Sequence, residues 1–462
     1  MGLRWAEIAA MTTTTALTLL LGQSPALAIT PAPIDSSALP EGLPPAPPQP
    51  TEQRSLCFSA ASAGDGPDVP LAQLSLGFES VWPITRGGGQ RVAVIDTGVG
   101  RHPRLPTLEA GGDYVGTSDG TEDCDVHGTV VAGLIAAQPM AGSGFAGGAP
   151  DAQIIAIRQS SAAFSAAGSS QAPDVAENSP GYGDVNTMAA AIRHAADLGA
   201  TVINISEVAC KSASDGIDDR RLGAAVEYAA VVKDAVVVAA AGNVGSGGCK
   251  TQNPPPDPLR PGHDLWQSVT TIASPAWYDD FVLTVGSVDP NGSASTFSLG
   301  GPWVGVAAPG TGIVSLSPTE PGLTNGKNGS DGASEPFDGT SFAAPFVAAT
   351  AALVRSRYPE LNAAQVIRRI QATAHAPAQG WNPYLGYGVV DPLAAVTAEF
   401  PEVGPTIDHR SVAISPLPPI PAADTRARDT ALIGAGAVAV VTVLAVLASV
   451  PIRRRMSERS AH

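Results

Sequence analysis

The chain has 462 residues, and its 26 Lys and Arg against 42 Asp and Glu give a formal net charge of −16. This excess of acidic residues would repel a phosphate backbone, which argues against nucleic acid as a partner. Hydrophobic residues make up 44% of the chain, enough to bury a large core, so wholesale disorder is excluded. The 50 Gly and 42 Pro indicate Pro- and Gly-rich segments beside globular sequence.

The N-terminus has the pattern of a secretory signal peptide. A basic residue, Arg4, precedes an apolar stretch from Ala16 to Leu21, and residues 26–28 read Ala-Leu-Ala, the small-x-small pattern that signal peptidase recognises. The alternative is an uncleaved anchor, but the apolar stretch falls short of the roughly 20 residues that span a bilayer. We therefore predict a signal peptide over residues 1–28 that is cleaved after Ala28.

A second apolar segment lies near the C-terminus. The run from Ala431 to Val450 contains no charged residue and would form a helix about 30 Å long, which matches the hydrocarbon core of a bilayer. A buried core helix is the alternative, but a cluster of arginines follows directly, and the positive-inside rule places that side in the cytoplasm. We predict a transmembrane helix over residues 431–452 and a basic cytoplasmic tail over residues 453–462. The chain before the helix is then expected on the periplasmic side of the cell membrane.

The cysteines fit an exported protein. Because such a chain meets oxidants, Cys57, Cys124, Cys210 and Cys249 are expected to form two disulfides, for which three pairings are possible. The spacings lack the Cys-x-x-Cys arrangement of a zinc site, and although Cys124 lies three residues before His127, we predict no metal and no cofactor.

Proline marks two further boundaries. Residues 31–50 are eight-twentieths proline, which rules out a helix or an interior strand and predicts an extended arm or linker over residues 29–74. A similar composition from Pro401 to Pro421 predicts a stalk over residues 399–430 that holds a domain off the membrane. The body between them, residues 75–398, shows no internal repeat and no linker long enough to separate two domains, so we predict one domain.

Within this body, short β-branched runs alternate with Ala-rich segments of helical pattern. Such alternation predicts an α/β fold with a doubly wound parallel sheet and helices on both faces. The runs that read as buried strands are Arg91 to Ile95, Gln153 to Ile157, Thr201 to Ile205, Ala235 to Ala239 and Phe281 to Val285. The segments that read as helices are Thr187 to Leu198, Leu222 to Val232, Phe346 to Tyr358 and, with Asn362 as its cap, Ala363 to Ala374.

Polar residues stand where four of these elements begin or end. Asp96 directly follows a buried strand in RVAVIDTGVG, and His127 opens a helix of small residues in DVHGTVVAGLIAA. Asn243 ends the strand in VVVAAAGN, and Ser341 lies at the mouth of a long apolar helix in FDGTSFAAPFVAATAALV. Taken singly, they also fit a loop aspartate, a capping or core histidine, a turn asparagine and an N-cap serine. In a parallel sheet, however, functional groups gather at the carboxyl edge of the strands.

Together these segments resemble the four signatures of the subtilisin family of serine proteases: DTGVG, HGTVVAG, AAAGN and GTSFAAP. Their order along the chain is one of the known orders of a Ser-His-Asp triad. The resemblance implies a subtilisin-like fold in which Ser341 is the nucleophile, His127 is the general base and then the general acid, and Asp96 orients the imidazole. It also implies that Asn243 and the Ser341 backbone N–H form the oxyanion hole.

Three other histidines have weaker cases for catalysis. His102, in GVGRHPRL, resembles the structural histidine that the family carries just past the aspartate. His194 falls in the middle of a predicted helix, and His263 falls in a Pro-rich loop. None of the three is expected to take part in catalysis.

The resemblance also assigns a substrate cleft. Ser206, at the end of the strand VINIS, and the opposite stretch with Ala240 and Gly242 resemble the two walls that hold an extended protein or peptide substrate. The family usually continues after such a serine with Leu-Gly, whereas here Glu207 and Val208 follow. An acidic side chain at this edge departs from the usual preference for apolar substrate side chains.

The overall layout narrows the resemblance. A signal peptide, a Pro-rich arm, four cysteines, a subtilisin-like body, a Pro-rich stalk, one C-terminal helix and a basic tail are together similar to the mycosins, the membrane-anchored subtilases of mycobacterial type VII secretion systems. This implies a serine endopeptidase outside the cytoplasmic membrane that processes few, secreted proteins and belongs to the secretion membrane complex. It also leaves a second hypothesis, in which the chain mainly stabilises that complex and proteolysis is limited.

Strand direction bears on the cysteine pairing. Cys210 and Cys249 lie just past two strands of the predicted parallel sheet, so both reach the same edge, and their loops can meet. Elimination then leaves Cys57 to pair with Cys124. The resulting pattern of two disulfides resembles that of the mycosins. This pairing would tie the arm down beside His127.

Overall fold

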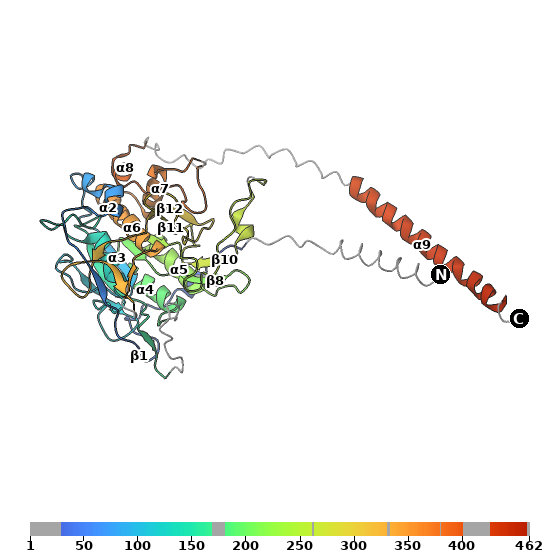
Figure 1. The fold of residues 1–462 in the computed structure, drawn as a ribbon, viewed down its shortest axis with the longest axis horizontal. Coiled ribbons are helices and arrows are strands. Elements are labelled where there is room, and N and C mark those ends of the chain that lie inside the picture. The colour runs from blue at the N-terminus through green and yellow to red at the C-terminus, as the bar shows by residue number, and fades with distance from the viewer. Residues whose placement is uncertain are drawn as a thin grey trace. The chain divides into compact units, whose positions relative to one another are not determined.

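In a computed structural model of the chain, a seven-stranded, all-parallel sheet forms the central layer of the fold (Figure 1). The structure describes residues 29–168, 181–260, 263–329, 333–378, 380–400 and 426–459. The strand order is β12-β11-β9-β7-β3-β5-β4. The strands are β3 (Arg91–Asp96), β4 (Glu109–Asp113), β5 (Gln153–Arg158), β7 (Val202–Ile205), β9 (Val236–Ala240), β11 (Val282–Val288) and β12 (Val304–Pro309).

The predicted fold class is confirmed, and each of the five predicted strands corresponds to a strand of this sheet within a few residues at each end. Two strands of this sheet were not predicted. The edge strand β4 reads EAGGD, which carries no β-branched residue and pairs with β5 through an irregular register. The other edge strand, β12, reads VGVAAP, where Gly, Ala and Pro obscure the β-branched pattern.

The helices lie on both faces of the sheet. They are α2 (Leu71–Leu76), α3 (His127–Ala136), α4 (Val185–Asp197), α5 (Arg220–Glu227), α6 (Thr340–Arg357), α7 (Ala363–Thr373) and α8 (Pro392–Thr397). Along β3, Val92 and Val94 belong to the core that contains α3 and α6, whereas Ala93 and Ile95 belong to the core that contains α4 and α5. Successive residues of a strand point to opposite faces, so one strand serves both cores.

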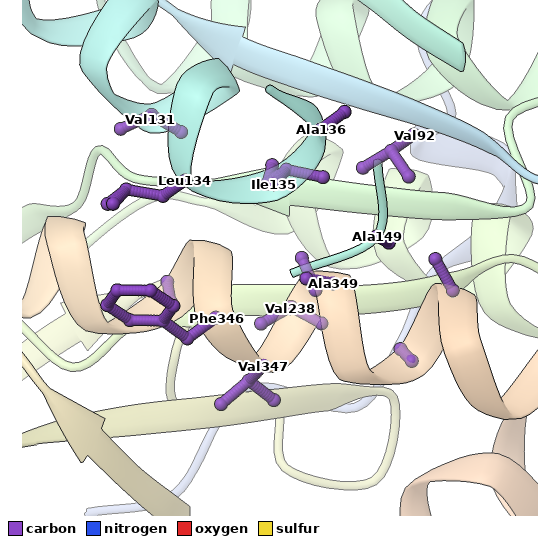
Figure 2. Packing of buried hydrophobic residues seen from close by; sticks show 14 of the residues in the cluster. Val92, Val131, Leu134, Ile135, Ala136, Ala149, Val238, Phe346, Val347 and Ala349 are labelled. Atoms are coloured by element: carbon purple, nitrogen blue, oxygen red, sulfur yellow. The ribbon is translucent and has the colours of Figure 1, made fainter. Parts of the chain in front are cut away.

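Figure 2 shows the first of these cores from close by. Leu134 and Ile135 of α3 lie over Phe346 and Ala349 of α6, and Val92 and Val238 reach the same region from the sheet. The helix α6 is buried over most of its length, from Thr340 through Val354, and most of these residues are apolar. Such a helix is held in place on all sides, which gives a fixed position to the residues at its N-terminus.

Two predicted helices differ from the structure at their ends, and the predicted start of a third is confirmed. The helix α6 begins at Thr340, six residues before the predicted start at Phe346, because Pro345 lies inside the helix rather than ahead of it. The segment predicted as Leu222 to Val232 divides into α5 and a π-helical turn, Tyr228–Val232. The N-cap predicted for α7 is confirmed, because the Asn362 side chain accepts from the Gln365 backbone N–H in a capping box.

The Pro-rich arm is not a free linker in this fold. Its strand β2 (Ala60–Ala63) pairs antiparallel with β14 (Leu323–Asn328), in a sheet that also holds β13 (Ser315–Leu316) and β15 (Ser334–Pro336). Its strand β1 (Thr51–Gln53) pairs with β6 (Phe164–Ala166), and the strands β8 (Ala209–Ser212) and β10 (Thr271–Ser274) form a separate pair. The helix α2 crosses the boundary predicted at residue 75. The described residues from Ile29 to Ala398 therefore form one compact unit.

The C-terminal unit contains the helix α9 (Arg426–Arg459). Its segment Asp429–Leu447, 19 residues with a mean hydropathy of 2.4, is long and apolar enough to cross a membrane. The helix begins inside the segment predicted as stalk and continues into the predicted tail. The predicted signal peptide, the stalk from 401 to 425 and the last three residues of the tail lie outside the described residues.

Candidate active site

Asp96, His127 and Ser341 meet at the carboxyl edge of the sheet, although 245 positions separate the first from the last. Asp96 ends β3, His127 begins α3, and Ser341 lies in the first turn of α6. The Asp96 Oδ1 lies 2.7 Å from His127 Nδ1, and His127 Nε2 lies 2.9 Å from Ser341 Oγ. These distances make a continuous hydrogen-bonded chain from a carboxylate through an imidazole to a hydroxyl.

Asp96 is held rigidly at the inner end of this chain. Its side chain is fully buried, and Oδ1 also accepts the backbone N–H of Thr97 at 2.7 Å. The helix α3 can approach it because Gly128 has no side chain: a Cβ there would lie 3.1 Å from Asp96 Oδ1 and 2.0 Å from the Gly98 carbonyl oxygen. The glycine of the HGT motif is therefore required by packing against the aspartate.

A second carboxylate, Asp123, joins the Asp96 turn to the start of α3. Its Oδ1 accepts the Thr97 hydroxyl at 2.9 Å, and its Oδ2 accepts the backbone N–H of Thr129 at 2.8 Å and the Thr129 hydroxyl at 2.6 Å. The Thr97 hydroxyl oxygen in turn accepts the backbone N–H of Gly128 at 3.0 Å. These bonds fix the separation between the elements that carry Asp96 and His127.

His127 enters its helix from a strained backbone position. The preceding residue, Val126, is fully buried and has φ of 71°, a conformation that β-branched residues adopt only under the constraint of surrounding structure. The Phe342 ring packs against the imidazole with centroids 4.9 Å apart. The imidazole is thus set by its backbone entry, an aromatic neighbour and its two hydrogen bonds.

The environment of His127 favours its protonated form. Burial opposes a charge on the ring, but the Asp96 carboxylate, its hydrogen bond and the nearby Glu207 outweigh this and raise the pKa of His127 to about 9. The ring therefore holds a proton more firmly than a solvated imidazole does.

Ser341 is positioned by an interruption in its own helix. Pro345 has no N–H to donate to the Ser341 carbonyl four residues earlier, so this oxygen lacks its helical partner. The hydroxyl of Ser206, which follows β7, donates to that carbonyl at 2.9 Å instead. The Ser206 oxygen also accepts from the Asn204 amide at 2.8 Å. A residue that directly follows β7 thereby fixes the backbone of Ser341.

The Asn243 side chain is oriented by Thr340. Its Oδ1 accepts the Thr340 backbone N–H at 2.9 Å and the Thr340 hydroxyl at 3.0 Å, so Nδ2 faces the other way. Nδ2 makes no hydrogen bond within the described parts of the chain. A Cβ on Gly339 would lie 3.2 Å from Asn243 Nδ2 and 3.0 Å from Ser341 Oγ, so this glycine leaves the space between them open. An oxygen atom that enters this space can accept from Asn243.

A cleft of about 770 Å³ opens over these groups. The predicted wall residues Ser206, Ala240 and Gly242 line it together with His127, Asn243 and Ser341. Phe58, from the arm, and Glu207 also line it. Sequence reasoning noted the acidic residue at 207 but not its approach to the histidine. It did place the arm beside His127, through the Cys57–Cys124 pairing.

Glu207 stands close to two members of the hydrogen-bonded chain. Its carboxylate, a carboxylate oxygen of Asp96 and a ring nitrogen of His127 all lie within 4.8 Å of one another. Burial raises the pKa of Glu207 to about 7, against the opposing influence of His127. Such a set of ligand atoms can hold a metal, but both ring nitrogens of His127 are already engaged by Asp96 and Ser341.

The three other histidines considered from the sequence lie elsewhere. His102 is buried, its Nδ1 accepts the Arg104 backbone N–H at 3.1 Å, and burial and Arg104 lower its pKa. His194 lies within α4, where burial lowers its pKa, and His263 lies in the loop before Asp264. None of the three is among the residues that line the cleft.

Both predicted disulfides are present. Cys57 is bonded to Cys124 and Cys210 to Cys249, which ties the arm beside the start of α3 and joins β8 to the loop after β9. A Cβ on Gly242 would lie 3.1 Å from the Cys249 sulfur, so the second disulfide packs directly against the cleft wall.

Comparisons with known proteins agree with this geometry. Residues 87–388 match the model of the Subtilase family. Mycosin-4 of Mycobacterium tuberculosis is 51% identical over 445 residues, which cover 94% of this chain and 94% of that protein. The crystal structure of MycP1 from the ESX-1 type VII secretion system is 45% identical, has a TM-score of 0.75 and covers 81% of this chain and 97% of its own. A chain in the structure of an intact ESX-5 inner membrane complex is 44% identical, has a TM-score of 0.75 and covers 91% of this chain and 100% of its own.

Proposed function

Because the chain belongs to the subtilase family of serine proteases, and within it to the mycosins, we propose that Asp96, His127 and Ser341 form its catalytic triad. The observation that carries this proposal is the hydrogen-bonded chain from the buried Asp96 carboxylate through His127 to the Ser341 hydroxyl. Nucleophile, base and orienting carboxylate are the three parts that acyl transfer by a serine requires.

The reaction follows from these positions. Ser341 Oγ attacks the scissile carbonyl carbon and passes its proton to His127 Nε2, while Asp96 stabilises the imidazolium through Nδ1–H. The resulting oxyanion accepts from Asn243 Nδ2 and from the Ser341 backbone N–H, which belongs to the first turn of α6 and has no helical acceptor. His127 then returns the proton to the departing amine, and water hydrolyses the acyl-enzyme.

The substrate is a protein or peptide in an extended conformation. Ser206, Ala240 and Gly242 follow or end neighbouring parallel strands, so their backbone lines the cleft on either side of Ser341. A cleft of this kind suits an endopeptidase, because it is open to a continuous chain rather than closed around a terminus.

The chain is anchored to the cell membrane with its peptidase domain outside the cytoplasm. In this proposal residues 1–28 are a signal peptide, 29–74 the arm, 75–398 the peptidase domain, 399–430 the stalk, 431–452 the membrane span and 453–462 a cytoplasmic tail. The apolar segment within α9 and the arginines that follow it support this orientation. The close relatives in ESX systems support membership of a type VII secretion membrane complex.

The activity is tested by comparing the N-termini of exported proteins from cells that carry the wild-type chain or Ser341→Ala. We expect a small set of new N-termini that disappear in Ser341→Ala. Ser293→Ala, which alters an exposed serine outside the cleft, serves as the matched control and should leave every N-terminus unchanged. Identical N-termini in all three strains would contradict proteolysis by this chain.

A second role, as a stabiliser of the membrane complex, is favoured by the similarity to a chain of the intact ESX-5 inner membrane complex, which extends over 91% of this chain. This role does not need the Ser341 hydroxyl. We expect the complex to be purified intact from cells with Ser341→Ala and to be lost or destabilised when the whole chain is deleted.

A further inference from the structure

Glu207 places a carboxylate in the cleft without a partner. It follows β7 directly after Ser206, and its side chain lines the cleft beside His127. The carboxylate makes no hydrogen bond and no ion pair with any part of the chain that the structure describes. A partly buried carboxylate in this state has lost much of its hydration without receiving a donor in return, which is energetically unfavourable.

The other charged groups of the cleft are already engaged. Asp125 accepts the backbone N–H of Ala162 at 2.8 Å, and Asp338 accepts the backbone N–H of Gly312 at 2.7 Å. Lys327 is paired with Glu335 at 3.2 Å. Glu207 is therefore the charged side chain of the described cleft that has neither a hydrogen bond nor an ion pair, and its nearest cationic group is the His127 ring, within 4.8 Å. The cleft carries more carboxylates than ammonium groups.

We propose that Glu207 selects substrates with a lysine or arginine side chain close to the scissile bond, and that this bound cation helps His127 to act as the base. The proposal rests on the proposed function and adds the substrate class. A cationic side chain supplies both the donor and the charge that Glu207 lacks. A metal ion is a poorer fit, because the two ring nitrogens beside Glu207 are bonded to Asp96 and Ser341.

The effect on the base follows from the charges that face His127. These are Asp96, Glu207, Asp123 and Asp125, and all four favour the imidazolium. Glu207 itself faces His127, Asp96 and Asp125. When a substrate cation pairs with Glu207, the field of this carboxylate at the imidazole is cancelled, and the cation also disfavours a second positive charge nearby. Binding of the correct substrate thus shifts His127 toward the neutral form that accepts the Ser341 proton.

The experiment uses the detergent-solubilised full-length chain and a library of quenched fluorescent peptides. Each of the positions around the cleaved bond carries Lys, Arg, norleucine or Glu in turn. We expect the wild-type chain to prefer Lys or Arg over norleucine at one position by roughly tenfold in kcat/KM at low salt. Glu207→Gln, which keeps the shape and removes the charge, should lose this preference.

The matched control is Asp338→Asn, which removes one negative charge from the same cleft and retains an oxygen that can accept from Gly312. It should keep the wild-type preference. A preference that persists in Glu207→Gln, or that falls equally in Asp338→Asn, would overturn the assignment to Glu207, as would an active enzyme with no basic preference at any position.

The pH profiles test the second half of the proposal. The profile of kcat/KM reports the free enzyme, and that of kcat reports the enzyme–substrate complex. For a basic peptide the inflection of kcat should fall at lower pH than that of kcat/KM, whereas a norleucine peptide should show no such difference. Coincident inflections for the basic peptide would refute substrate assistance to His127.

Peptide binding separates this proposal from the proposed function. Affinities for the basic and norleucine peptides are measured by fluorescence anisotropy in Ser341→Ala and in Ser341→Ala with Glu207→Gln, neither of which needs activity. If the wild-type chain cleaves no peptide, a Glu207-dependent preference in binding still supports the basic subsite. Equal affinities in both variants overturn it, whether or not the wild-type chain is active.

Discussion

Replacing both cysteines of one disulfide by serine separates the roles of the two bridges. The Cys57–Cys124 bridge closes a loop with a sequence separation of 67, and the Cys210–Cys249 bridge closes one of 39. In the chain-entropy treatment of the unfolded state, each closure is worth about 4 kcal/mol, because the dependence on loop length is only logarithmic. The two double-serine variants are therefore expected to lose similar stability, but they remove bridges from different parts of the structure.

The expected change in melting temperature follows from the size of the folded unit. About 370 residues between Ile29 and Ala398 unfold with an entropy of roughly 0.8 kcal/mol per kelvin, so a loss of about 4 kcal/mol lowers the Tm by about 5 °C. Scanning calorimetry of the detergent-solubilised chain measures this shift. We expect both variants to show it.

The local effects should differ. Without Cys57–Cys124, the arm is held by the pairing of β2 with β14 and of β1 with β6, so amide hydrogen exchange should rise in residues 51–63 while kcat on a peptide substrate stays within about twofold. The Cys210–Cys249 bridge packs against Gly242, whose N–H donates to the Thr340 hydroxyl at 3.1 Å, and Thr340 orients Asn243. Loss of this bridge should reduce kcat, by up to the 10²–10³-fold that one oxyanion donor is worth.

Three results would refute this reasoning. Equal losses of kcat in the two variants would mean that the second bridge does not act through Asn243. Unchanged exchange in the arm after loss of the first bridge would mean that strand pairing alone holds it. A Tm shift in one variant only would show that the entropy of loop closure does not dominate.

The triad should behave as a unit, so that Ser341→Ala, His127→Ala and the double variant lose similar amounts of kcat, on the order of 10⁶-fold, in single-turnover assays; multiplicative losses would argue against it. Asn243→Ala should lower kcat by about 10²–10³-fold with little change in KM, because its amide faces the oxyanion rather than the bound ground state, and an effect confined to KM would contradict this role. On peptides without a basic residue, kcat/KM should rise as pH increases toward about 9, because only the neutral His127 ring accepts a proton. Burial disfavours a charged ring, but Asp96 and Glu207 outweigh it and raise the pKa of His127 to about 9. A profile that is flat between pH 6 and 9 would be inconsistent with this base.

The sheet could be predicted where burial leaves a continuous β-branched run, as in RVAVID and QIIAIR. It could not be predicted at β4, whose Gly-rich sequence becomes a strand only because β5 offers it a partner at the edge. Pairing with a distant segment is a tertiary effect that the local pattern does not contain. The same holds for β2, which is a strand because β14 lies beside it.

The start of α6 shows a different limit. The helix predicted from Phe346 would avoid an interior proline, which removes a hydrogen bond and crowds the carbonyl four residues earlier. The cost is offset by Ser206, which donates to that carbonyl from a strand more than a hundred residues away. A rule about helices fails here because the compensation comes from another element, at a functional position where the backbone of Ser341 has to be fixed.

The candidate site was predictable as a set of motifs but not as a network. The sequence identified Asp96, His127, Asn243 and Ser341 because each stands at the end or start of a regular element. It contained no signal for Asp123 as the link between the first two, since an acidic residue in DCDVHG also fits a solvated loop. The approach of Glu207 to His127 could likewise not be predicted from the sequence. It depends on the distance between the residues that follow β3 and those that follow β7, which only the folded sheet determines.

The charge distribution around His127 bears on how selective such a protease is. Asp96 and Glu207 favour the imidazolium form of His127 and so oppose its action as a base, and a peptide that brings no charge does nothing to change this. Under the inference drawn for Glu207, a basic substrate corrects this state as it binds, and its binding energy is used at the step where the proton moves. Selectivity then arises in kcat as well as in affinity. An intact triad and a narrow set of substrates are therefore compatible, because the restriction comes from a carboxylate beside the base and not from any defect in the triad.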